Sequence, residues 1–307
     1  MQALTAHRYQ FNCRALESLR FGFYSGSMLR GAFGNALRKT VCVTRLDDCN
    51  ACLLQRQCNY PKVFETPPPR NSTFQQFSRI PQPFVLEPPP MGAKHLAEGE
   101  PFAFNLVLIG QAVACLPIII FAIQRALEHG LGKHRAKAEL VDVVFEPGHV
   151  VETKLYCADE GQLLSAPAFQ LPALDDREQI TLQVMTPLRI QQKGQILSEK
   201  MTGKDFLMAL IRRYYLLQEF HGIDYQSPDF HELAKQAEAV WSRNRFSWCQ
   251  WKRYSSRQKQ TMSFTGVLGE MQLTGPLSSF LPYLTQGQWL HVGNKTTFGM
   301  GGYRIID

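Results

Sequence analysis

Apolar and polar positions in the first half of the chain alternate between strand-like and helix-like spacing. Residues 4–15 favour an opening strand, and residues 25–41 repeat apolar side chains at the spacing of a helix. Residues 102–109 change from alternating to continuously apolar, which is typical of a central strand. A helical stretch at residues 116–129 and a further strand at residues 138–145 complete this half.

Between the first helix and the central strand, residues 61–90 are rich in proline and polar side chains, which predicts mostly loop. If residues 83–86 contribute one short strand, the first half has the order β-α-β-β-α-β. That order is the ferredoxin-like one. We therefore expect a ferredoxin-like domain within residues 1–150.

The second half repeats these element types without recognisable sequence repetition. Residues 151–179 are expected to be a connector, and residues 180–307 to form the second domain. Two domains are also what a length of 307 residues favours. In the second domain the pattern predicts strands at 180–190, 246–273 and the C-terminus, and helices at 205–220, 229–240 and 276–285.

Charge and hydropathy narrow the range of partners. The net charge of +7 fits a folded protein with a polyanionic partner such as nucleic acid, although a merely basic protein would have the same charge. Residues 1–20 contain no apolar signal-peptide core, and the longest apolar stretch, 112–123, is too short to cross a bilayer. We therefore expect a cytoplasmic protein without a membrane partner, in which the eight cysteines form no disulfide scaffold.

The most informative motif is the C-terminal segment 291–303, HVGNKTTFGMGGY. Glycine allows backbone conformations closed to other residues and lets a partner approach closely. Backbone amides in such a turn can face phosphates, and Lys295 adds positive charge. A glycine-rich hairpin with no ligand would have the same sequence. The segment lacks the GxxxxGK pattern of a P-loop, so no nucleotide cofactor is expected.

Four cysteines follow the first predicted helix at spacings of six, two and five intervening residues: Cys42, Cys49, Cys52 and Cys58. A Cys-x2-Cys pair within a set of four thiols is typical of a closed structural zinc site. We expect structural Zn²⁺ here. Unliganded thiols and an iron–sulfur cluster are the alternatives.

Together these segments resemble the CRISPR-associated endoribonucleases that process precursor crRNA, the Cas-six (Cas6) family of the RAMP superfamily. The resemblance extends from about residue 20 to the C-terminus, in the family's order. The matching passages are GSMLRGAFGNALRKTVC, the cysteine run ending at Thr66, FNLVLIGQAV, EHGLGKHRAKAEL, VMTPLRI, RYSSRQKQTMSFTGVLGE and LHVGNKTTFGMGGY.

The resemblance implies an α+β protein of two tandem ferredoxin-like (RRM-like, RAMP) domains with a C-terminal glycine-rich loop that approaches RNA. It also implies CRISPR repeat RNA as the partner, with other Cas subunits as further possible partners. Cleavage in this family needs no catalytic metal. A ribose 2′-OH attacks the adjacent phosphate, giving a 2′,3′-cyclic phosphate or 3′-phosphate and a 5′-OH.

The sequence departs from the family at the first helix, where related chains often carry a histidine in a GHALR-like run. Here that position is Asn35, which cannot act as a general acid or base near neutral pH. Either another residue transfers the proton, or cleavage depends on positioning and charge, or the chain is a non-catalytic crRNA-binding subunit of an effector complex. A scaffold with no RNA role would leave the charge and the C-terminal loop unexplained. The catalytic candidates are Tyr24, Arg30, Arg38, Lys39 and His134.

Two segments supply the candidate RNA-binding residues. Residues 248–259 interleave aromatic rings, which can stack on bases, with cations, which can hold phosphates. Because side chains alternate along a strand, only half of them can face a partner, and the pattern leaves open which half. The candidates are Lys252, Arg253, Tyr254, Arg257 and Lys259 in this segment, and Gly293, Lys295, Thr297, Gly299, Gly301 and Gly302 in the glycine-rich one.

Overall fold

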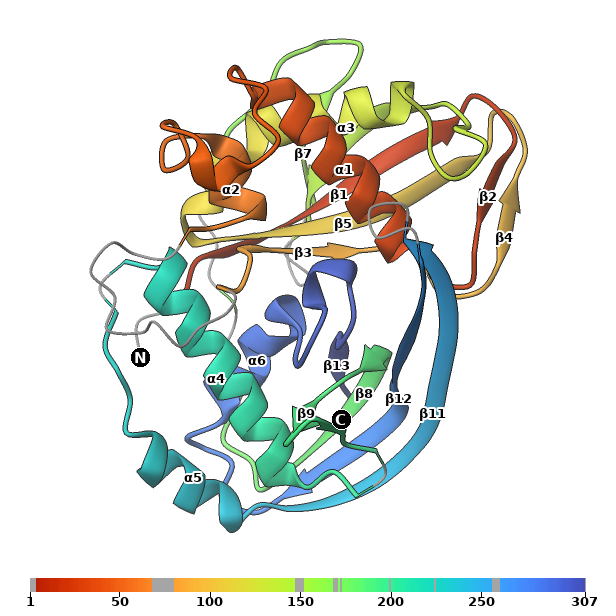
Figure 1. Ribbon diagram of the computed structural model, residues 1–307. Coiled ribbons are helices and arrows are strands. Elements are labelled where there is room, and N and C mark those ends of the chain that lie inside the picture. Colours follow the sequence, from red (N-terminus) through yellow and green to blue (C-terminus); the bar gives the residue numbers. More distant parts are fainter. Residues whose placement is uncertain are drawn as a thin grey trace. The chain divides into compact units, whose positions relative to one another are not determined.

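The chain divides into two compact units in the computed structural model (Figure 1). Unit 1 comprises Met1–Phe169 and Leu216–Tyr225, and unit 2 comprises Gln170–Tyr215 and Gln226–Asp307. The structure describes residues 4–67, 80–146, 152–167, 171, 173–198, 200–223, 225–255 and 260–306.

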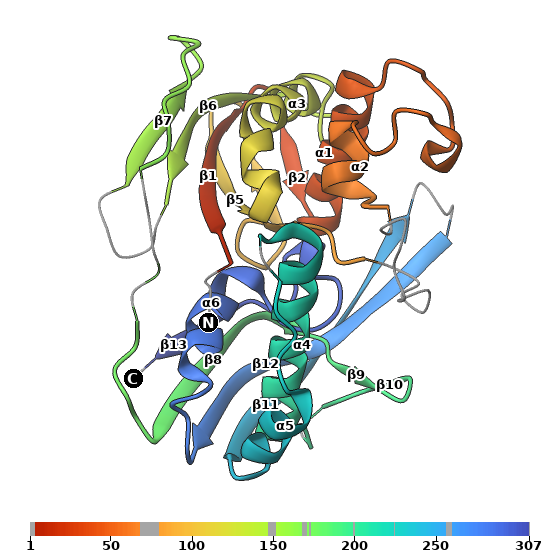
Figure 2. The ribbon, with the colours of Figure 1, turned by 90° about the vertical axis from the view of Figure 1, so that its left-hand side faces the viewer.

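Unit 1 is built on a five-stranded antiparallel sheet in the order β3-β5-β1-β6-β7. Figure 2 labels four of these strands, β7, β6, β1 and β5. Its first four positions have the ferredoxin-like order, and β7 extends the edge beyond β6. The elements are β1 (Ala6–Ala15), β2 (Leu19–Phe21), α1 (Gly26–Val41), α2 (Asn59–Phe64), β3 (Phe84–Glu87), β4 (Lys94–Leu96), β5 (Pro101–Ile109), α3 (Leu116–Glu128), β6 (Ala138–Phe145) and β7 (Thr153–Cys157).

Helices α1 and α3 pack against each other and bury their apolar sides in the core of unit 1 (Figure 1). The Phe33 ring of α1 meets the Phe84 ring of β3 edge-on, with 5.8 Å between centroids. Gly34 is required beside it, because a Cβ there would lie only 2.5 Å from the Phe64 ring of α2. Phe11 and Phe104 stack across β1 and β5 at 5.3 Å. Aromatic packing therefore sets how closely α1 approaches α2 and the sheet.

The stretch Gly110–Glu128 is long and apolar enough to pass a compositional test for a membrane-spanning helix. In the structure it forms a 3₁₀ turn followed by α3, and half of its most apolar window is buried. The buried side includes Ile119 and Ile123. Its apolar character is therefore that of a core helix in unit 1.

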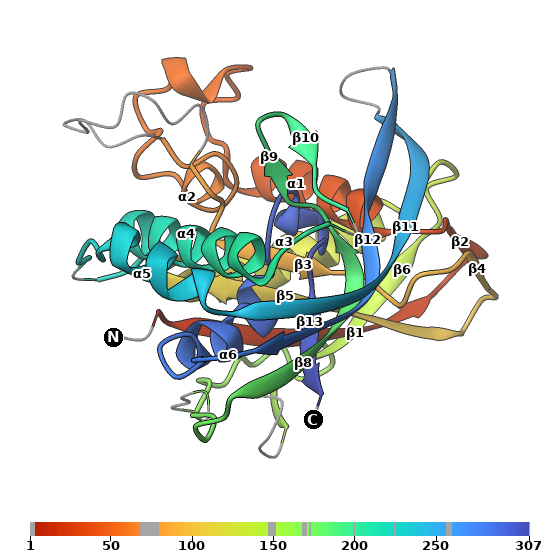
Figure 3. The same cartoon turned by 90° about the horizontal axis from the view of Figure 1, so that it is seen from below.

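Unit 2 repeats the arrangement with a four-stranded antiparallel sheet in the order β11-β12-β8-β13. Strands β11 and β12 pair along their whole described length, past the point where β8 stops pairing (Figure 3). The elements are β8 (Gln179–Leu188), β9 (Gln191–Gln192), β10 (Gln195–Ile196), α4 (Gly203–His221, whose last turns belong to unit 1), α5 (Phe230–Glu238), β11 (Trp241–Ser255), β12 (Gln260–Thr274), α6 (Leu281–Leu290) and β13 (Tyr303–Ile306).

The predicted α+β class with two ferredoxin-like halves is confirmed, and several elements differ from their predicted places, among them the last helix and β7. The last helix begins at Leu281 instead of residue 276, because the chain first turns through Phe280 and Pro282 then fits the first helical turn. Within the predicted connector, Thr153–Cys157 pairs with β6 as strand β7. A five-residue edge strand is hard to separate from loop by pattern alone.

Candidate functional site

A small hollow in unit 1 lies between α1 and the end of α3. Its volume is about 100 Å³, which is below the roughly 300–1,000 Å³ of pockets that enclose whole small-molecule ligands. It suits one group of a longer ligand. Its lining comprises Ala32, Asn35, Ala36 and Lys39 from α1, Arg125 and Ala126 from α3, and His129, Gly130 and Arg135 after it.

Helical spacing explains why polar groups from both helices meet at this place. Asn35 and Lys39 are four residues apart on α1, and Arg125 and His129 are four residues apart along α3 and its C-terminal cap. Residues at this spacing lie on the same face of a helix. The alanines beneath them are small enough to leave the hollow open.

The chain then turns back sharply, which brings in Arg135. Gly130 has a φ of 89°, and a Cβ there would lie 2.0 Å from the Arg135 carbonyl oxygen. Leu131 and Ala136 exchange two backbone hydrogen bonds of 2.8 and 3.0 Å, which close the turn. Arg135 itself has a positive φ of 52°, which is uncommon for a residue with a side chain. Glycine at residue 130 is therefore needed for Arg135 to reach the hollow.

The hollow is strongly cationic. Lys39, Arg125 and Arg135 carry permanent positive charge, and none of the lining residues is a carboxylate. Its polar side chains are exposed, so a ligand can reach them from solvent. Cationic side chains attract the negatively charged oxygens of a phosphate. They repel a divalent cation, which would need carboxylate or other oxygen ligands that the lining does not concentrate.

Of the five predicted catalytic residues, only Lys39 lines this hollow. Tyr24 is buried before α1. Arg30 lies over the Phe64 ring at 4.4 Å and donates to Gln82. Arg38 donates to the Leu46 and Asp47 carbonyl oxygens, each at 2.6 Å, and so holds the loop after α1.

His134, the fifth candidate, is exposed in the turn after α3 and does not line the hollow. Three polar lining residues were missed from the sequence: Arg125, His129 and Arg135. The available signal was the glycine directly after His129, which marks a helix end, and the i, i+4 spacing back to Arg125. Nothing in the sequence predicted that the turn carrying Arg135 would fold back toward α1.

The glycine-rich segment of unit 2 packs closely along the end of β8. Thr186 Oγ1 donates to the Gly299 carbonyl at 2.6 Å and accepts from the Gly302 amide at 2.8 Å. His291 is buried, and its Nδ1 donates to the Met300 carbonyl at 3.1 Å. A Cβ on Gly301, whose φ is 76°, would lie 1.9 Å from the Val292 carbonyl oxygen. This glycine is therefore required by the chain's own packing.

Within this segment, Gly299, Gly301 and Gly302 are buried, whereas Gly293, Lys295 and Thr297 are half-buried. The Lys295 ammonium lies 4.6 Å from the centroid of the Phe264 ring of β12. Arg189 donates at 2.6 Å to the Oγ1 of Thr265, which also lies on β12. Burial lowers the pKa of Arg189. Two cations thus adjoin the middle of β12, beside the glycine-rich segment.

A half-buried arginine of α4 fixes the start of the segment. Arg213 of α4 donates to the Leu290 carbonyl at 2.8 Å, at the C-terminus of α6. Burial lowers the pKa of Arg213 to about 9. A cation at this helix end satisfies one of the last carbonyl groups.

On strand β11, the structure shows for two residues which side chain faces the core and which faces solvent. Trp251 is buried and packs on Phe264 at 5.4 Å, whereas Lys252 is exposed. Lys252 therefore faces solvent, on the opposite side from Trp251. The side chains of Arg253 and Tyr254, and the whole of Arg257 and Lys259, lie outside the described residues.

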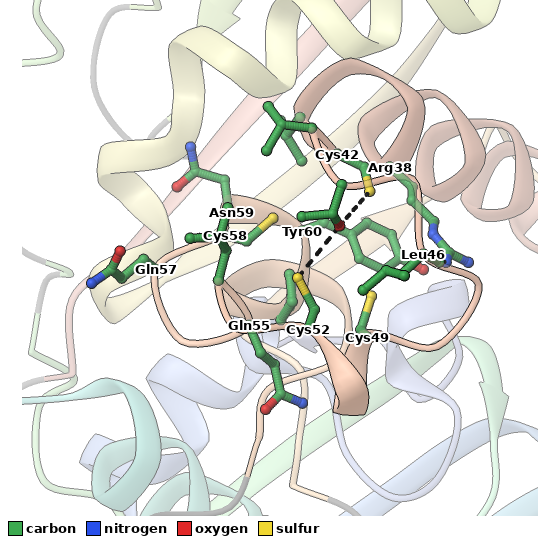
Figure 4. A pocket seen from close by; sticks show the side chains of 15 residues that line it. Arg38, Cys42, Leu46, Cys49, Cys52, Gln55, Gln57, Cys58, Asn59 and Tyr60 are labelled. Carbon is green, nitrogen blue, oxygen red and sulfur yellow. Dashed lines mark hydrogen bonds between the residues drawn. The ribbon is translucent and has the colours of Figure 1, made fainter.

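The four cysteines after α1 line a second pocket of about 240 Å³ (Figure 4). Thr44 Oγ1 lies 3.9 Å from the Cys42 sulfur and 3.5 Å from that of Cys52. In the part of the chain that the structure describes, no three potential ligands converge as a metal site requires, so the predicted structural zinc at Cys42, Cys49, Cys52 and Cys58 is not supported. Spacing alone could not show that a hydroxyl would separate two of the thiols.

Two family models match the chain. Residues 4–168 match AF_1859_N, described as an N-terminal domain, and residues 182–303 match CRISPR-associated endoribonuclease Cas6. An uncharacterized protein of Archaeoglobus fulgidus is 24% identical over 287 residues, which cover 92% of this chain and 91% of that one.

Solved structures resemble the fold across its length. A Cas6 in a product complex has a TM-score of 0.60 and 16% identity, covering 98% of this chain and 100% of the other. A Thermus thermophilus Cas6 has a TM-score of 0.53 over 100% of both chains, at 16% identity. A partial Cas6-RT-Cas1–Cas2 complex contains a chain with a TM-score of 0.55 and 13% identity, covering 99% of this chain and 46% of that one.

Proposed function

Because the chain belongs to the Cas6 family of CRISPR-associated endoribonucleases, we propose that it binds the repeat RNA of a CRISPR precursor transcript and cuts the transcript into guide units. The observation that carries the proposal is the carboxylate-free hollow around Lys39, Arg125 and Arg135. Its size and charge fit one phosphodiester group of a polynucleotide. Other Cas proteins are the second proposed class of partner, since one similar solved chain is part of a complex with Cas1 and Cas2.

The proposed reaction is a transesterification within the RNA. The ribose 2′-oxygen forms a bond to phosphorus while the bond from phosphorus to the 5′-oxygen of the next nucleotide breaks. The 2′-OH loses its proton and the leaving oxygen gains one, giving a 2′,3′-cyclic phosphate and a 5′-OH. The protein must hold these atoms in line and stabilise the added charge on the phosphate oxygens. Lys39, Arg125 and Arg135 would supply that charge stabilisation without a metal ion.

A second candidate function is a non-catalytic crRNA-binding subunit. Asn35 favours it, because the α1 side of the hollow then offers no group that titrates near neutral pH. The two functions share the RNA partner and differ only in turnover. Cleavage of the repeat separates them.

Incubation of the protein with its repeat RNA in EDTA tests the proposed function. We expect cleavage at one position, with a rate within about threefold of that in Mg²⁺, because permanent cations of the protein do the work that a metal would do. The products should carry a 2′,3′-cyclic phosphate or 3′-phosphate and a 5′-OH, as identified by mass spectrometry. Loss of cleavage in EDTA that Mg²⁺ restores, or a 5′-phosphate product, would reject this mechanism.

We further propose that the glycine-rich segment and the exposed part of β11 hold the RNA backbone in unit 2. Lys295, with its ammonium beside Phe264, supplies a phosphate contact, and Gly293 and Thr297 adjoin it. Lys252 on the exposed side of β11 supplies another contact. Such contacts position RNA without reading its sequence.

Lys295→Ala should weaken binding to the repeat and to a scrambled RNA by the same factor, and lower the salt slope of log K by about 1. Fluorescence anisotropy at several salt concentrations measures both. Lys235→Ala is the matched control, since it removes an exposed lysine of α5 in the same unit. A slope unchanged from wild type, or a loss confined to the repeat, would remove Lys295 from the phosphate contacts.

A further inference from the structure

The proposed cleavage needs a group that accepts the proton of the 2′-OH, and Asn35 cannot do so. Histidine is the side chain whose ordinary pKa suits this task at neutral pH. Unit 1 contains six histidines, and the structure describes all of them except His149. The environment of each described imidazole shows whether it could reach a phosphodiester.

Three of these histidines are engaged within the fold, away from the hollow. His7 is packed against Tyr9 and Phe145, and burial lowers its pKa. His95 Nε2 lies 2.7 Å from the Ser18 hydroxyl, at the small β2–β4 sheet. His221 is buried, and its Nε2 donates to the Pro81 carbonyl at 2.7 Å.

The other two lie near the hollow, but only His129 lines it. His134 is exposed in the turn that follows α3. His129 caps the C-terminus of α3, and its amide donates to the Arg125 carbonyl. It therefore shares the hollow with Lys39, Arg125 and Arg135, where the proposed function places the phosphate.

We propose that His129 is the catalytic base of the cleavage, and this inference rests on the proposed function. Its imidazole takes the 2′-OH proton as the 2′-oxygen bonds to phosphorus. The bond from phosphorus to the 5′-oxygen breaks, and a solvent water in the open hollow gives that oxygen its proton. The hydroxide so formed takes the proton from the imidazolium, which restores His129. A base at the C-terminal cap of α3 thus lines the same hollow as Asn35 of α1.

Local geometry fixes the backbone that carries the imidazole. The helix cap fixes the backbone of residue 129, and Gly130, in its left-handed conformation, turns the chain immediately afterwards. Two positioned cations flank the histidine: Arg125 lies one helical turn before it, and Arg135 follows in the closed turn. Pre-positioning of this kind is what a general base needs.

Single-turnover cleavage by full-length His129→Ala, in EDTA and with the protein in excess of the repeat RNA and above the Kd, tests the proposal. We expect the rate to fall by about 10²–10⁴-fold, the usual contribution of a general base, with the Kd within about twofold of wild type. His95→Ala, which removes an exposed histidine of unit 1 that does not line the hollow, should cleave within about threefold of wild type. Because His129 is exposed, the alanine variant should fold, and circular dichroism checks this.

A second variant separates proton transfer from positioning. Asn35→His combined with His129→Ala places an imidazole on the α1 side of the same hollow, and we expect at least about a tenfold recovery over His129→Ala. A merely structural role of His129 would not respond to this exchange. His129→Ala cleaving like wild type, or losing rate only through weaker binding, would overturn the inference, as would a double variant no faster than His129→Ala.

Failure of the inference and failure of the proposed function give different results. If wild-type protein binds the repeat but never cuts it, the proposed function fails and no histidine needs assigning. If wild type cuts and His129→Ala cuts equally well, only the assignment of the base fails.

Discussion

Gly301→Ala should lower the free energy of unfolding of unit 2 by about 3 kcal/mol or more. An L-residue held at an unfavourable positive φ costs about 1–3 kcal/mol, and the Cβ would also lie 1.9 Å from the Val292 carbonyl oxygen. Either the glycine-rich segment must move or its hydrogen bonds to Pro187 and Val292 must break. The chain offers a selective probe, because all four tryptophans lie in unit 2. Urea unfolding followed by tryptophan fluorescence therefore reports this unit.

Gly31→Ala is the matched control for this substitution. Gly31 lies within α1, and a Cβ there would meet nothing within 4 Å. Because Gly31 lies in unit 1, alanine there should leave the tryptophan transition of unit 2 unchanged. Circular dichroism should show unit 1 stabilised by about 0.5–1 kcal/mol, because glycine is a poor helix former. If Gly301→Ala instead unfolds like wild type and only RNA binding falls, the residue faces the ligand and the packing account is wrong.

This expectation shows where sequence reasoning about the glycine-rich segment stops. The sequence HVGNKTTFGMGGY predicts unusual backbone, and positive φ values at Gly293, Gly299 and Gly301 agree with that. It could not show what the glycines accommodate. Gly301 makes room for Val292, a contact within the segment itself. The hydrogen bonds that seat the segment come from Thr186, more than a hundred residues earlier.

The fold was more predictable than the site, because periodicity is local whereas a site is assembled from distant elements. Strand β6 has the predicted bounds, and the apolar stripe of α1 identified that helix to within one residue. Sheet order then follows from the ferredoxin-like pattern. The hollow instead depends on a turn that brings Arg135 back onto α1, and on His129 ending a helix. Neither feature produces a periodic pattern of apolar residues that would predict it from the sequence.

At the four cysteines after α1, the sequence spacing predicted a zinc site that the structure does not support. Cys49 and Cys52 have the separation of a zinc knuckle, and the chain between them forms a short 3₁₀ turn. Among the described residues no three potential metal ligands converge, and the Thr44 hydroxyl lies within 4 Å of both the Cys42 and the Cys52 sulfur. A spacing motif therefore needs convergent side chains before it predicts a metal.

A single 2′-deoxy substitution in the RNA has the largest expected effect on the reaction. If the 2′-oxygen is the nucleophile, removing it from the nucleotide just 5′ of the cut leaves no group to attack the phosphate. Cleavage should fall below detection, which is at least about 10⁴-fold. The phosphates are unchanged, so their contacts with the protein should persist, and the Kd should stay within about threefold of the all-ribose repeat.

The measurement is single-turnover cleavage of the full repeat RNA carrying that one deoxynucleotide, in EDTA, beside a control repeat with the deoxynucleotide three positions away. The account predicts intact bound RNA in the first case and normal cleavage in the second. Cleavage of the first substrate at the normal site would contradict attack by the 2′-OH, and binding of the all-ribose repeat without any cleavage would show an RNA-binding subunit instead of an endoribonuclease.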